Sequence, residues 1–586
     1  MYIENINLPK DIKKLSVEQL SVLAEEVRTA LIRKLSEHGG HIGPNLGMVE
    51  TTIALHYVFN SPIDKIVFDV SHQSYVHKML TGRMAAFLDP AKYDDVTGYT
   101  NPDESEHDFF TIGHTSTSVS LAMGLAKGRD LIGGKENIIA VIGDGSLGGG
   151  EALEGLNNAA MLGSNMIIIV NDNDQSIAEN HGGLYKGLKE LRDTNGESPD
   201  NIFKAMGLEY YYLGDGHDVS ALIKLFTSVK DIDRAVVLHI HTIKGKGLKY
   251  AEENKEYWHA GGPFHIEDGS PKGPGWPVNE TVRESVLDLI EKRSDVVAIT
   301  AGTPSVIGFT EDYRKRAGKQ FVDVGIAEEH AVAMASGIAR NGGTPIFGVF
   351  SPFLQRTYDQ LSSDLCLNNN PAVIMVFMAS VYGMNSNTHL GIYDIPMISH
   401  IPNLVYLAPT SKEEYLAMFK YATTQKAHPI AIRIPMMMPE TGIEDTTDYS
   451  LLNKYQVVRK GSSVAIIALG DFFELGVQIA DKYKILTGND VTLINPKFIT
   501  GIDEELLECL KTDHELVLTL EDGIVEGGFG QTIASFYGLS DMKVKNYGIK
   551  KSFPTDFRPE ELMRENGLSV EKIVEDIKSV CREHVM

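Results

Sequence analysis

The fold of this chain is decided by residues 137–177, which read NIIAVIGDGSLGGGEALEGLNNAAMLGSNMIIIVNDNDQSI. An apolar run ends at Gly143-Asp144-Gly145, a helical pattern follows, and a second apolar run ends at Asn171-Asp172-Asn173. This order of strand, helix and strand predicts one unit of a parallel sheet. Both strands end at the same edge of such a sheet, and that edge is where parallel sheets bind their ligands.

Two functional interpretations of this turn compete. The glycines of 143–148 fit the G-x-G-x-x-G dinucleotide fingerprint, which would make the chain a dinucleotide-dependent oxidoreductase. The carboxylate of Asp144 argues against it, because it would repel a pyrophosphate unless a cation intervenes. With Mg²⁺, Asp144 and Asn173 become ligands that also fix a bound diphosphate. The joint spacing of G-D-G and N-D-N is typical of thiamine diphosphate sites, whereas ordinary Asx turns explain only single positions.

The rest of the chain repeats the alternation of buried strands and helices. A first helix begins after Ser16, with Gln19 in the capping-box position. The Pro- and Gly-rich stretch 268–277 and PMMMPETG (435–442) break the pattern. We therefore expect three tandem α/β domains with mostly parallel sheets, at 1–267, 278–440 and 453–586. Strands are predicted at 65–70, 137–143, 165–171, 235–242, 296–300, 320–326, 344–350, 372–378, 404–409, 463–470, 490–496 and 515–522.

Composition excludes several classes of protein. The 586 residues include 54 Lys and Arg against 79 Asp and Glu, a net charge of −25, so neither nucleic acid nor an anionic membrane is an expected partner. Hydrophobic residues make up 43%, too many for a disordered chain. Three scattered cysteines indicate neither a disulfide framework nor a zinc site. With no signal peptide or apolar span, we predict a cytoplasmic protein.

A second carboxyl group that could be functional, that of Glu328, lies in FVDVGIAEEHAV (321–332). A strand ends near Gly325 and a helix starts near Ala327, which places Glu328 in the first turn. Thiamine chemistry needs a carboxyl group beside the aminopyrimidine ring, and a half-buried glutamate with a raised pKa suits that role. An acidic residue that merely complements a helix N-terminus is the competing interpretation.

These residues resemble the 1-deoxy-D-xylulose-5-phosphate synthase family of the transketolase group, over nearly the whole chain. The resemblance implies a diphosphate-binding domain (1–267), a pyrimidine-binding domain (278–440), a transketolase-like C-terminal domain (453–586) and a homodimer. It implies condensation of pyruvate with glyceraldehyde 3-phosphate, using thiamine diphosphate and Mg²⁺. The motifs that carry it, besides those above, are GGHIGPNLGMVE (39–50), ALHYVFNSP (54–62), FDVSHQSYVHKMLTGR (68–83), GHTSTSVSLAMGLA (113–126), HTIKGKGLKYAE (241–252), FLQRTYDQ (353–360), NTHLG (387–391) and EGGFGQ (526–531).

The resemblance also implies roles for individual residues. Mg²⁺ would be bound by Asp144, Asn173 and the backbone carbonyl of Gln175. Glu328 would act on the aminopyrimidine, and His41, His259 and His389 would face the reacting groups. The remaining cofactor-binding residues would be His72, His114, Ser116, Gly145, Ser146, Asn173, Ile177 and Phe353. The substrate-binding residues would be Arg356, Arg433, His389 and Asn385.

The acceptor end departs from the family pattern. Phe350, Met378 and Asn385 stand where the family usually has tyrosine, arginine and aspartate, and the loss of an arginine removes a charge-assisted contact. These departures favour, as an alternative, a paralogue with another aldehyde acceptor. A transketolase and a non-catalytic binding protein remain as separate alternatives. Residues 182–201 are polar and contain glycine, which suggests a mobile cover over the site.

Overall fold

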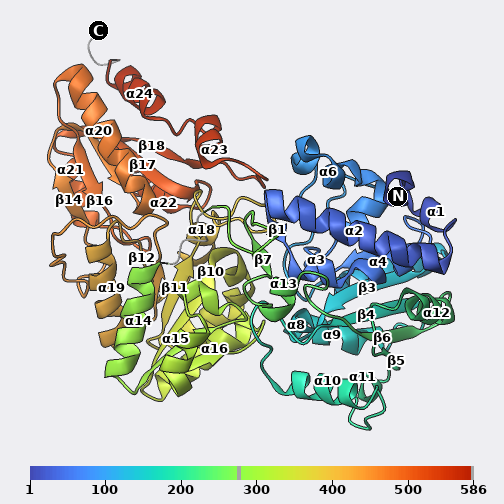
Figure 1. Cartoon of the computed structure of the whole chain (residues 1–586). Coiled ribbons are helices and arrows are strands. Elements are labelled where there is room, and N and C mark those ends of the chain that lie inside the picture. Colours follow the sequence, from blue (N-terminus) through green and yellow to red (C-terminus); the bar gives the residue numbers. More distant parts are fainter. Residues whose placement is uncertain (274–278, 583–586) are drawn as a thin grey trace. The chain divides into compact units, whose positions relative to one another are not determined.

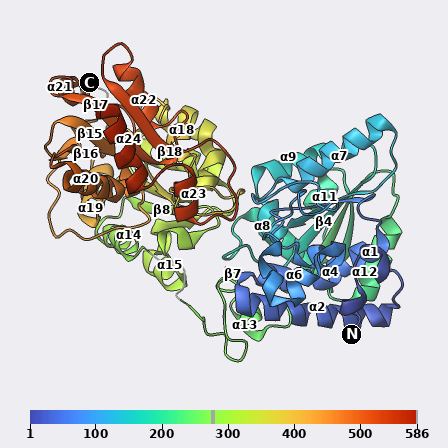
Figure 2. The same ribbon diagram turned by 90° about the horizontal axis from the view of Figure 1, so that it is seen from above.

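The computed structural model describes residues 1–273 and 279–582 of the chain (Figures 1 and 2). The chain divides into two compact units, which we describe separately. Unit 1 contains residues 1–277 with 324–327, and unit 2 contains residues 278–323 and 328–586. Residues 274–278, at the end of the predicted linker, lie outside the described residues.

Unit 1 is built on a parallel five-stranded sheet in the order β2 (Lys65–Phe68), β3 (Ile138–Gly143), β4 (Met166–Asp172), β6 (Ala235–His241), β5 (Glu209–Leu213). Alternate strand residues pack on opposite faces: Ile138 and Ala140 pack with α7 (Ser118–Ile132) and α9 (Gly150–Ala159). Figure 2 shows these two helices together on one side of the sheet. Ile139 and Val141 meet α4 (Val49–Val58) and α12 (Val219–Val229) on the other face. Burial on both faces explains why these strands are continuous apolar runs.

Unit 2 contains two sheets. The first is parallel, in the order β12 (Val405–Leu407), β13 (Ile430–Arg433), β11 (Val373–Phe377), β10 (Thr344–Phe350), β8 (Val296–Thr300), β9 (Phe321–Asp323). The second runs β14 (Gln456–Arg459), β16 (Thr492–Asn495), β15 (Ser463–Ala468), β17 (His514–Ile524), β18 (Lys543–Ile549). Only β14 is antiparallel to its neighbour in that sheet, among the residues described.

The remaining helices of unit 1 are α1 (Pro9–Ile12), α2 (Val17–His38), α3 (Gly43–Gly47), α5 (Tyr75–Lys78), α6 (Ala85–Leu88), α8 (Asp144–Leu147), α10 (Gly183–Asp193), α11 (Ile202–Ala205) and α13 (Lys249–Glu253). Those of unit 2 are α14 (Glu280–Lys292), α15 (Glu311–Ala317), α16 (Glu328–Arg340), α17 (Ser351–Leu354), α18 (Asp394–Ile398), α19 (Lys412–Thr424), α20 (Phe473–Thr487), α21 (Glu504–Leu510), α22 (Phe529–Tyr537), α23 (Pro559–Glu565) and α24 (Val570–Arg582). None of the helices in the described ranges is long and apolar enough to cross a membrane.

Every strand predicted from the sequence overlaps an observed strand, and the mostly parallel α/β fold is confirmed. The capping box is also confirmed. Ser16 Oγ accepts a hydrogen bond from the backbone N–H of Gln19 at 3.3 Å, and Gln19 Oε1 accepts one from the backbone N–H of Ser16 at 2.8 Å. The strands that sequence reasoning missed include the edge strands β5 and β14, whose residues are half-buried or exposed. The two later predicted domains fall in one compact unit, so their separation stays a prediction.

Candidate functional site

One cluster of predicted site residues lies in unit 1, where β3 and β4 end side by side. Gly143 pairs with Asn171, so Asp144 begins α8 next to the Asn171-Asp172-Asn173 turn. The Asp144 side chain is buried, and its Oδ2 accepts a hydrogen bond from Asn180 Nδ2 at 2.8 Å. Burial, and then the nearby charge of Asp172, raise the pKa of Asp144 well above its usual range. A carboxylate placed this way favours a bound cation.

Asn173 offers a second oxygen atom that could bind a metal ion. Its residue is 7% exposed, and its buried Oδ1 has no hydrogen-bond partner among the described residues. Its backbone oxygen accepts a hydrogen bond from Lys255 Nζ at 3.2 Å, which fixes the turn. A buried oxygen without a partner is costly unless a ligand binds it. A carboxylate and an amide oxygen are both ligands that Mg²⁺ binds in proteins, so Asp144 and Asn173 fit the predicted metal.

Close backbone approach explains the glycines that follow. A Cβ on Gly145 would lie 2.9 Å from the Ser176 side chain, and one on Gly149 would lie 2.1 Å from Ser116 Oγ. Ser116, in a left-handed conformation at φ +75°, donates from Oγ to the backbone oxygen of Ser146 at 2.7 Å. Gly145, Ser146 and Ser116, all predicted to bind the cofactor, therefore lie together.

The loops bearing His72 and His114 are joined by a residue that sequence reasoning missed. Asp69 follows β2 and is fully buried, and its carboxylate accepts hydrogen bonds from the amides of Ser116 at 2.8 Å and Ser118 at 2.9 Å. The next two residues, Val70 and Ser71, have φ values of +57° and +63°. Positive φ at a β-branched residue is strained, and such strain concentrates at functional sites. The only sequence signal was an acidic residue at the end of an apolar run.

Three predicted histidines meet in unit 1. The ring centroids of His41 and His72 lie 5.0 Å apart, those of His72 and His259 5.3 Å, and those of His41 and His259 5.8 Å. His41 and His259 come together because β1 (Gly40–His41) pairs with β7 (Ala260–Gly261). Burial, and then the charge of Lys244, lowers the pKa of His41 to about 4 and that of His259 well below its usual range. Both rings are therefore neutral proton acceptors at pH 7.

Lys244 is a second residue that sequence reasoning did not single out. Its side chain is among the largest fully buried ones, and Nζ donates to the backbone oxygen of Ser176 at 2.5 Å. Burial lowers the pKa of Lys244 to about 7, although the charge of Asp144 opposes this shift. Gln175 and Ile177 flank Ser176, and Gln175 Nε2 donates to the Ile177 oxygen at 3.4 Å. A buried lysine that can gain or lose a proton near neutral pH thus lies beside the predicted diphosphate-binding turn.

A separate cluster of predicted site residues lies in unit 2 around Glu328, the first residue of α16. Glu328 is 4% exposed, and Arg356 Nη1 lies 3.8 Å from its Oε2. Burial raises the pKa of Glu328 to about 7, against the opposing effect of Arg356. The ring of Phe353 lies 5.5 Å from that of His389 and 5.9 Å from that of Phe350. Because its pKa is about 7, Glu328 can hold or release a proton near neutral pH.

The predicted anion-binding Arg433 is enclosed by acidic residues. It is 3% exposed, and its guanidinium pairs with Asp394, at 2.7 Å from Nε, and with Asp522. Asn385 donates from Nδ2 to the Phe557 oxygen at 3.2 Å, and Met378 lies at the end of β11 with φ +56°. The roles of these residues toward a substrate stay predictions.

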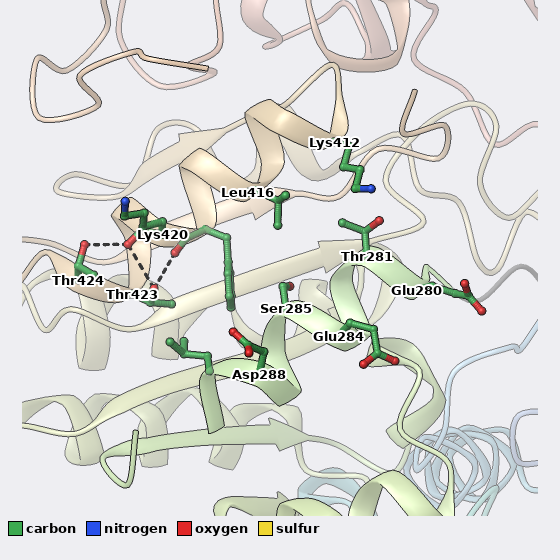
Figure 3. Close-up of a pocket in the computed structure, with 12 residues that line it drawn as sticks. Glu280, Thr281, Glu284, Ser285, Asp288, Lys412, Leu416, Lys420, Thr423 and Thr424 are labelled. Atoms are coloured by element: carbon green, nitrogen blue, oxygen red, sulfur yellow. Dashed lines mark hydrogen bonds between the residues drawn. The ribbon is translucent and has the colours of Figure 1, made fainter. Parts of the chain in front are cut away.

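A groove of about 620 Å³ lies elsewhere in unit 2, between α14 and α19 (Figure 3). Glu280, Glu284 and Asp288 line one wall, and Lys412 and Lys420 line the other. None of the predicted site residues lines it. The groove is therefore not the site that the motifs predict.

Comparison with known families divides the chain into three stretches. Residues 3–198 and 193–242 match the model described as 1-deoxy-D-xylulose-5-phosphate synthase. Residues 277–439 match the transketolase pyrimidine-binding domain, and residues 453–573 match the transketolase C-terminal domain. The fold is therefore transketolase-like.

The chain is also similar to whole proteins. The 1-deoxy-D-xylulose-5-phosphate synthases of Carboxydothermus hydrogenoformans and Lachnoclostridium phytofermentans are each 37% identical to this chain. The first alignment covers 97% of this chain and 98% of the relative, and the second covers 100% and 99%. A solved transketolase from Campylobacter jejuni is 17% identical over 96% of this chain and 100% of that one, with a TM-score of 0.44.

Proposed function

Since the chain belongs to the 1-deoxy-D-xylulose-5-phosphate synthase family, we propose that it condenses pyruvate with glyceraldehyde 3-phosphate. The products would be CO₂ and 1-deoxy-D-xylulose 5-phosphate, which makes the chain a transketolase-type transferase. The observation that carries the proposal is the pair formed by Asp144 and Asn173. A buried carboxylate with a raised pKa and a buried oxygen without a partner stand at adjacent strand ends, where a metal-bound diphosphate would satisfy both.

The cofactors would be thiamine diphosphate and Mg²⁺. Asp144, Asn173 and the backbone carbonyl of Gln175 would hold the metal. Thiamine diphosphate, when bound, supplies the electron sink for decarboxylation and carbon-carbon bond formation. The other residues proposed to bind the cofactor are His72, His114, Ser116, Gly145, Ser146, Ile177 and Phe353.

The protein's own groups would manage protons and orientation. Glu328, poised near neutral pH, would hold a proton toward the aminopyrimidine ring. His41 and His259, neutral at pH 7, would accept or return protons, and His389 would face the substrate. Arg356, Arg433 and Asn385 would bind substrate. Since Arg433 is already paired with two carboxylates, an acceptor phosphate would have to compete for its guanidinium.

Three further proposals concern the domains, the oligomeric state and the location. The first two rest on the resemblance to the family, and the location rests on the sequence. We propose a diphosphate-binding domain (1–267), a pyrimidine-binding domain (278–440) and a C-terminal domain (453–586). The family matches at 3–242, 277–439 and 453–573 support this division. We also propose a homodimer located in the cytoplasm.

The test is a carboligation assay with the purified full chain, Mg²⁺, thiamine diphosphate and carboxyl-labelled pyruvate. Labelled CO₂ and 1-deoxy-D-xylulose 5-phosphate should form when glyceraldehyde 3-phosphate is added, and Glu328→Gln should abolish both. A panel of unphosphorylated aldehydes tests the acceptor in parallel. Faster reaction with such an aldehyde would favour the paralogue with another acceptor, and product from a ketose donor without CO₂ would indicate a transketolase.

A further inference from the structure

Helix α10 carries an arginine that reaches the turn proposed to bind Mg²⁺. Arg192 Nη1 lies 2.6 Å from Asp172 Oδ2, and Arg192 Nη2 lies 2.6 Å from Asp174 Oδ1. One guanidinium therefore holds the carboxylates on both sides of Asn173. We propose that Arg192 is a positioning residue for the metal-diphosphate site, which it serves by fixing Asn173 and neutralising its two acidic neighbours. This proposal rests on the proposed function.

The geometry of the turn supports a positioning role. Asp174 has a left-handed backbone, with φ +63°, and its amide donates to Asp172 Oδ1 at 3.1 Å. Aspartate adopts this conformation more readily than most residues, and the bonds of Asp174 to Asp172 and Arg192 hold the turn in it. The planar guanidinium offers two parallel donors, so it can set the spacing of two carboxylates in a way that a lysine cannot. Asn173, between them, is thereby held with its unpaired Oδ1 in one orientation.

The negative charge around the proposed metal site is a second reason to assign a positioning role to Arg192. Asp144, Asp172 and Asp174 are three carboxylates at two adjacent strand ends, and a diphosphate adds further negative charge. Asp172 is completely buried and also accepts a hydrogen bond from His239 Nε2 at 2.7 Å. With Arg192 bound to Asp172 and Asp174, Asp144 is left as the carboxylate available to Mg²⁺. Without Arg192, the two flanking carboxylates would repel the diphosphate or compete for the cation.

Helix α10 is held over the site by other contacts from the same segment. Asn180 Nδ2 donates to Asp144 Oδ2 at 2.8 Å, and Tyr185 Oη donates to the Gly145 oxygen at 3.1 Å. The segment predicted as a mobile cover (182–201) thus contacts both turns through Tyr185 and Arg192, and Asn180 lies just before it. Arg192 is nearly buried, at 10% side-chain exposure, whereas its neighbour Lys189 is 64% exposed and pairs with Asp193.

The experiment measures thiamine diphosphate binding to the full chain by isothermal titration calorimetry at saturating Mg²⁺. We compare the unsubstituted protein with Arg192→Gln, Arg192→Lys and Lys189→Gln. Residues that orient metal ligands typically affect affinity by about 10- to 100-fold, so both Arg192 variants should lose at least about tenfold. Lys189→Gln removes the same charge from the same helix and should change the affinity less than about twofold. Thermal unfolding without cofactor verifies that each variant is folded.

Each other outcome contradicts the proposal. Unchanged affinity in Arg192→Gln would show that the arginine only supports the helix. Full rescue by Arg192→Lys would show that charge alone matters, and an equal loss in Lys189→Gln would show a general electrostatic effect. If the unsubstituted protein does not bind thiamine diphosphate, the proposed function fails and this role fails with it. Normal binding and carboligation with unaffected Arg192 variants would overturn this role alone.

Discussion

Replacing Asp144 with asparagine should separate cofactor binding from folding. Asp144 is the carboxylate among the proposed Mg²⁺ ligands, and it is also a buried acid whose pKa is raised by burial and by Asp172. Asparagine keeps the size and one oxygen but removes the charge. We therefore expect the cofactor-free variant to unfold at the same temperature as the unsubstituted protein or higher, because a costly buried charge is gone.

The loss should appear when cofactor is added. A ligand at 100 times its dissociation constant stabilises a protein by about 2.7 kcal/mol. If the substitution weakens binding about 100-fold, the same concentration equals the dissociation constant and stabilises by about 0.4 kcal/mol. At roughly 2–4 °C per kcal/mol for a unit of this size, the shift in unfolding temperature should fall from about 5–10 °C to about 1–2 °C.

Differential scanning fluorimetry with and without thiamine diphosphate and Mg²⁺ measures both quantities. Asp193→Asn is the matched control, because it makes the same change at a side chain that is 60% exposed at the end of α10. Its ligand-induced shift should equal that of the unsubstituted protein. A full shift in Asp144→Asn would refute the assignment of Asp144 to the metal. Survival of binding without Mg²⁺ would instead revive the dinucleotide interpretation of the glycine-rich turn.

Two other substitutions test buried carboxyl groups. Glu328→Gln should raise the free energy of unfolding of the cofactor-free protein by about 3 kcal/mol at pH 8 and by less than about 1 kcal/mol at pH 5. The reason is that burial raises the pKa of Glu328 from 4.5 to about 7. The cost of burying the ionised carboxylate therefore grows as the pH rises, and glutamine removes that cost. Urea denaturation at both pH values measures this, and an equal gain at both would contradict it. Asp69→Asn should lower the free energy of unfolding by about 1–3 kcal/mol, because asparagine leaves an amide of Ser116 or Ser118 unpaired. It should also weaken thiamine diphosphate binding in calorimetry, and normal affinity in a destabilised variant would show that Asp69 serves the fold alone.

The sequence predicted the strand ends well because they depend on local patterns. Strands such as β3 and β4 are buried on both faces, so each is a continuous apolar run that stops where the chain reaches the ligand-binding edge. The polar residues directly after the run must then lie at that edge. The same reasoning fails for β14, which lies at an edge of its sheet and alternates between exposed and half-buried residues.

Residues that support the site could not be predicted in this way. Asp69 and Lys244 are single charged residues whose importance depends on burial and on partners far away in sequence, and periodicity carries no information about either. The segment 182–201 looked like a polar cover, yet α10 within it carries Arg192 back to residues 18 and 20 positions earlier. Only the folded backbone brings such a pair together.

The acidic composition explains why buried arginines pair with the protein's own carboxylates. Arg192 and Arg433 each pair with two carboxylates, so both are engaged by the protein's own acidic residues. In unit 1 this arrangement would leave Asp144 to bind the proposed cation, which could then bind an anionic diphosphate despite a net charge of −25. In unit 2, Asp394 and Asp522 enclose Arg433, so we expect the proposed phosphorylated acceptor to depend more heavily on Arg356. The affinity for a phosphorylated aldehyde should therefore be more sensitive to substitution of Arg356 than to substitution of Arg433, whose loss would chiefly leave two buried carboxylates unpaired.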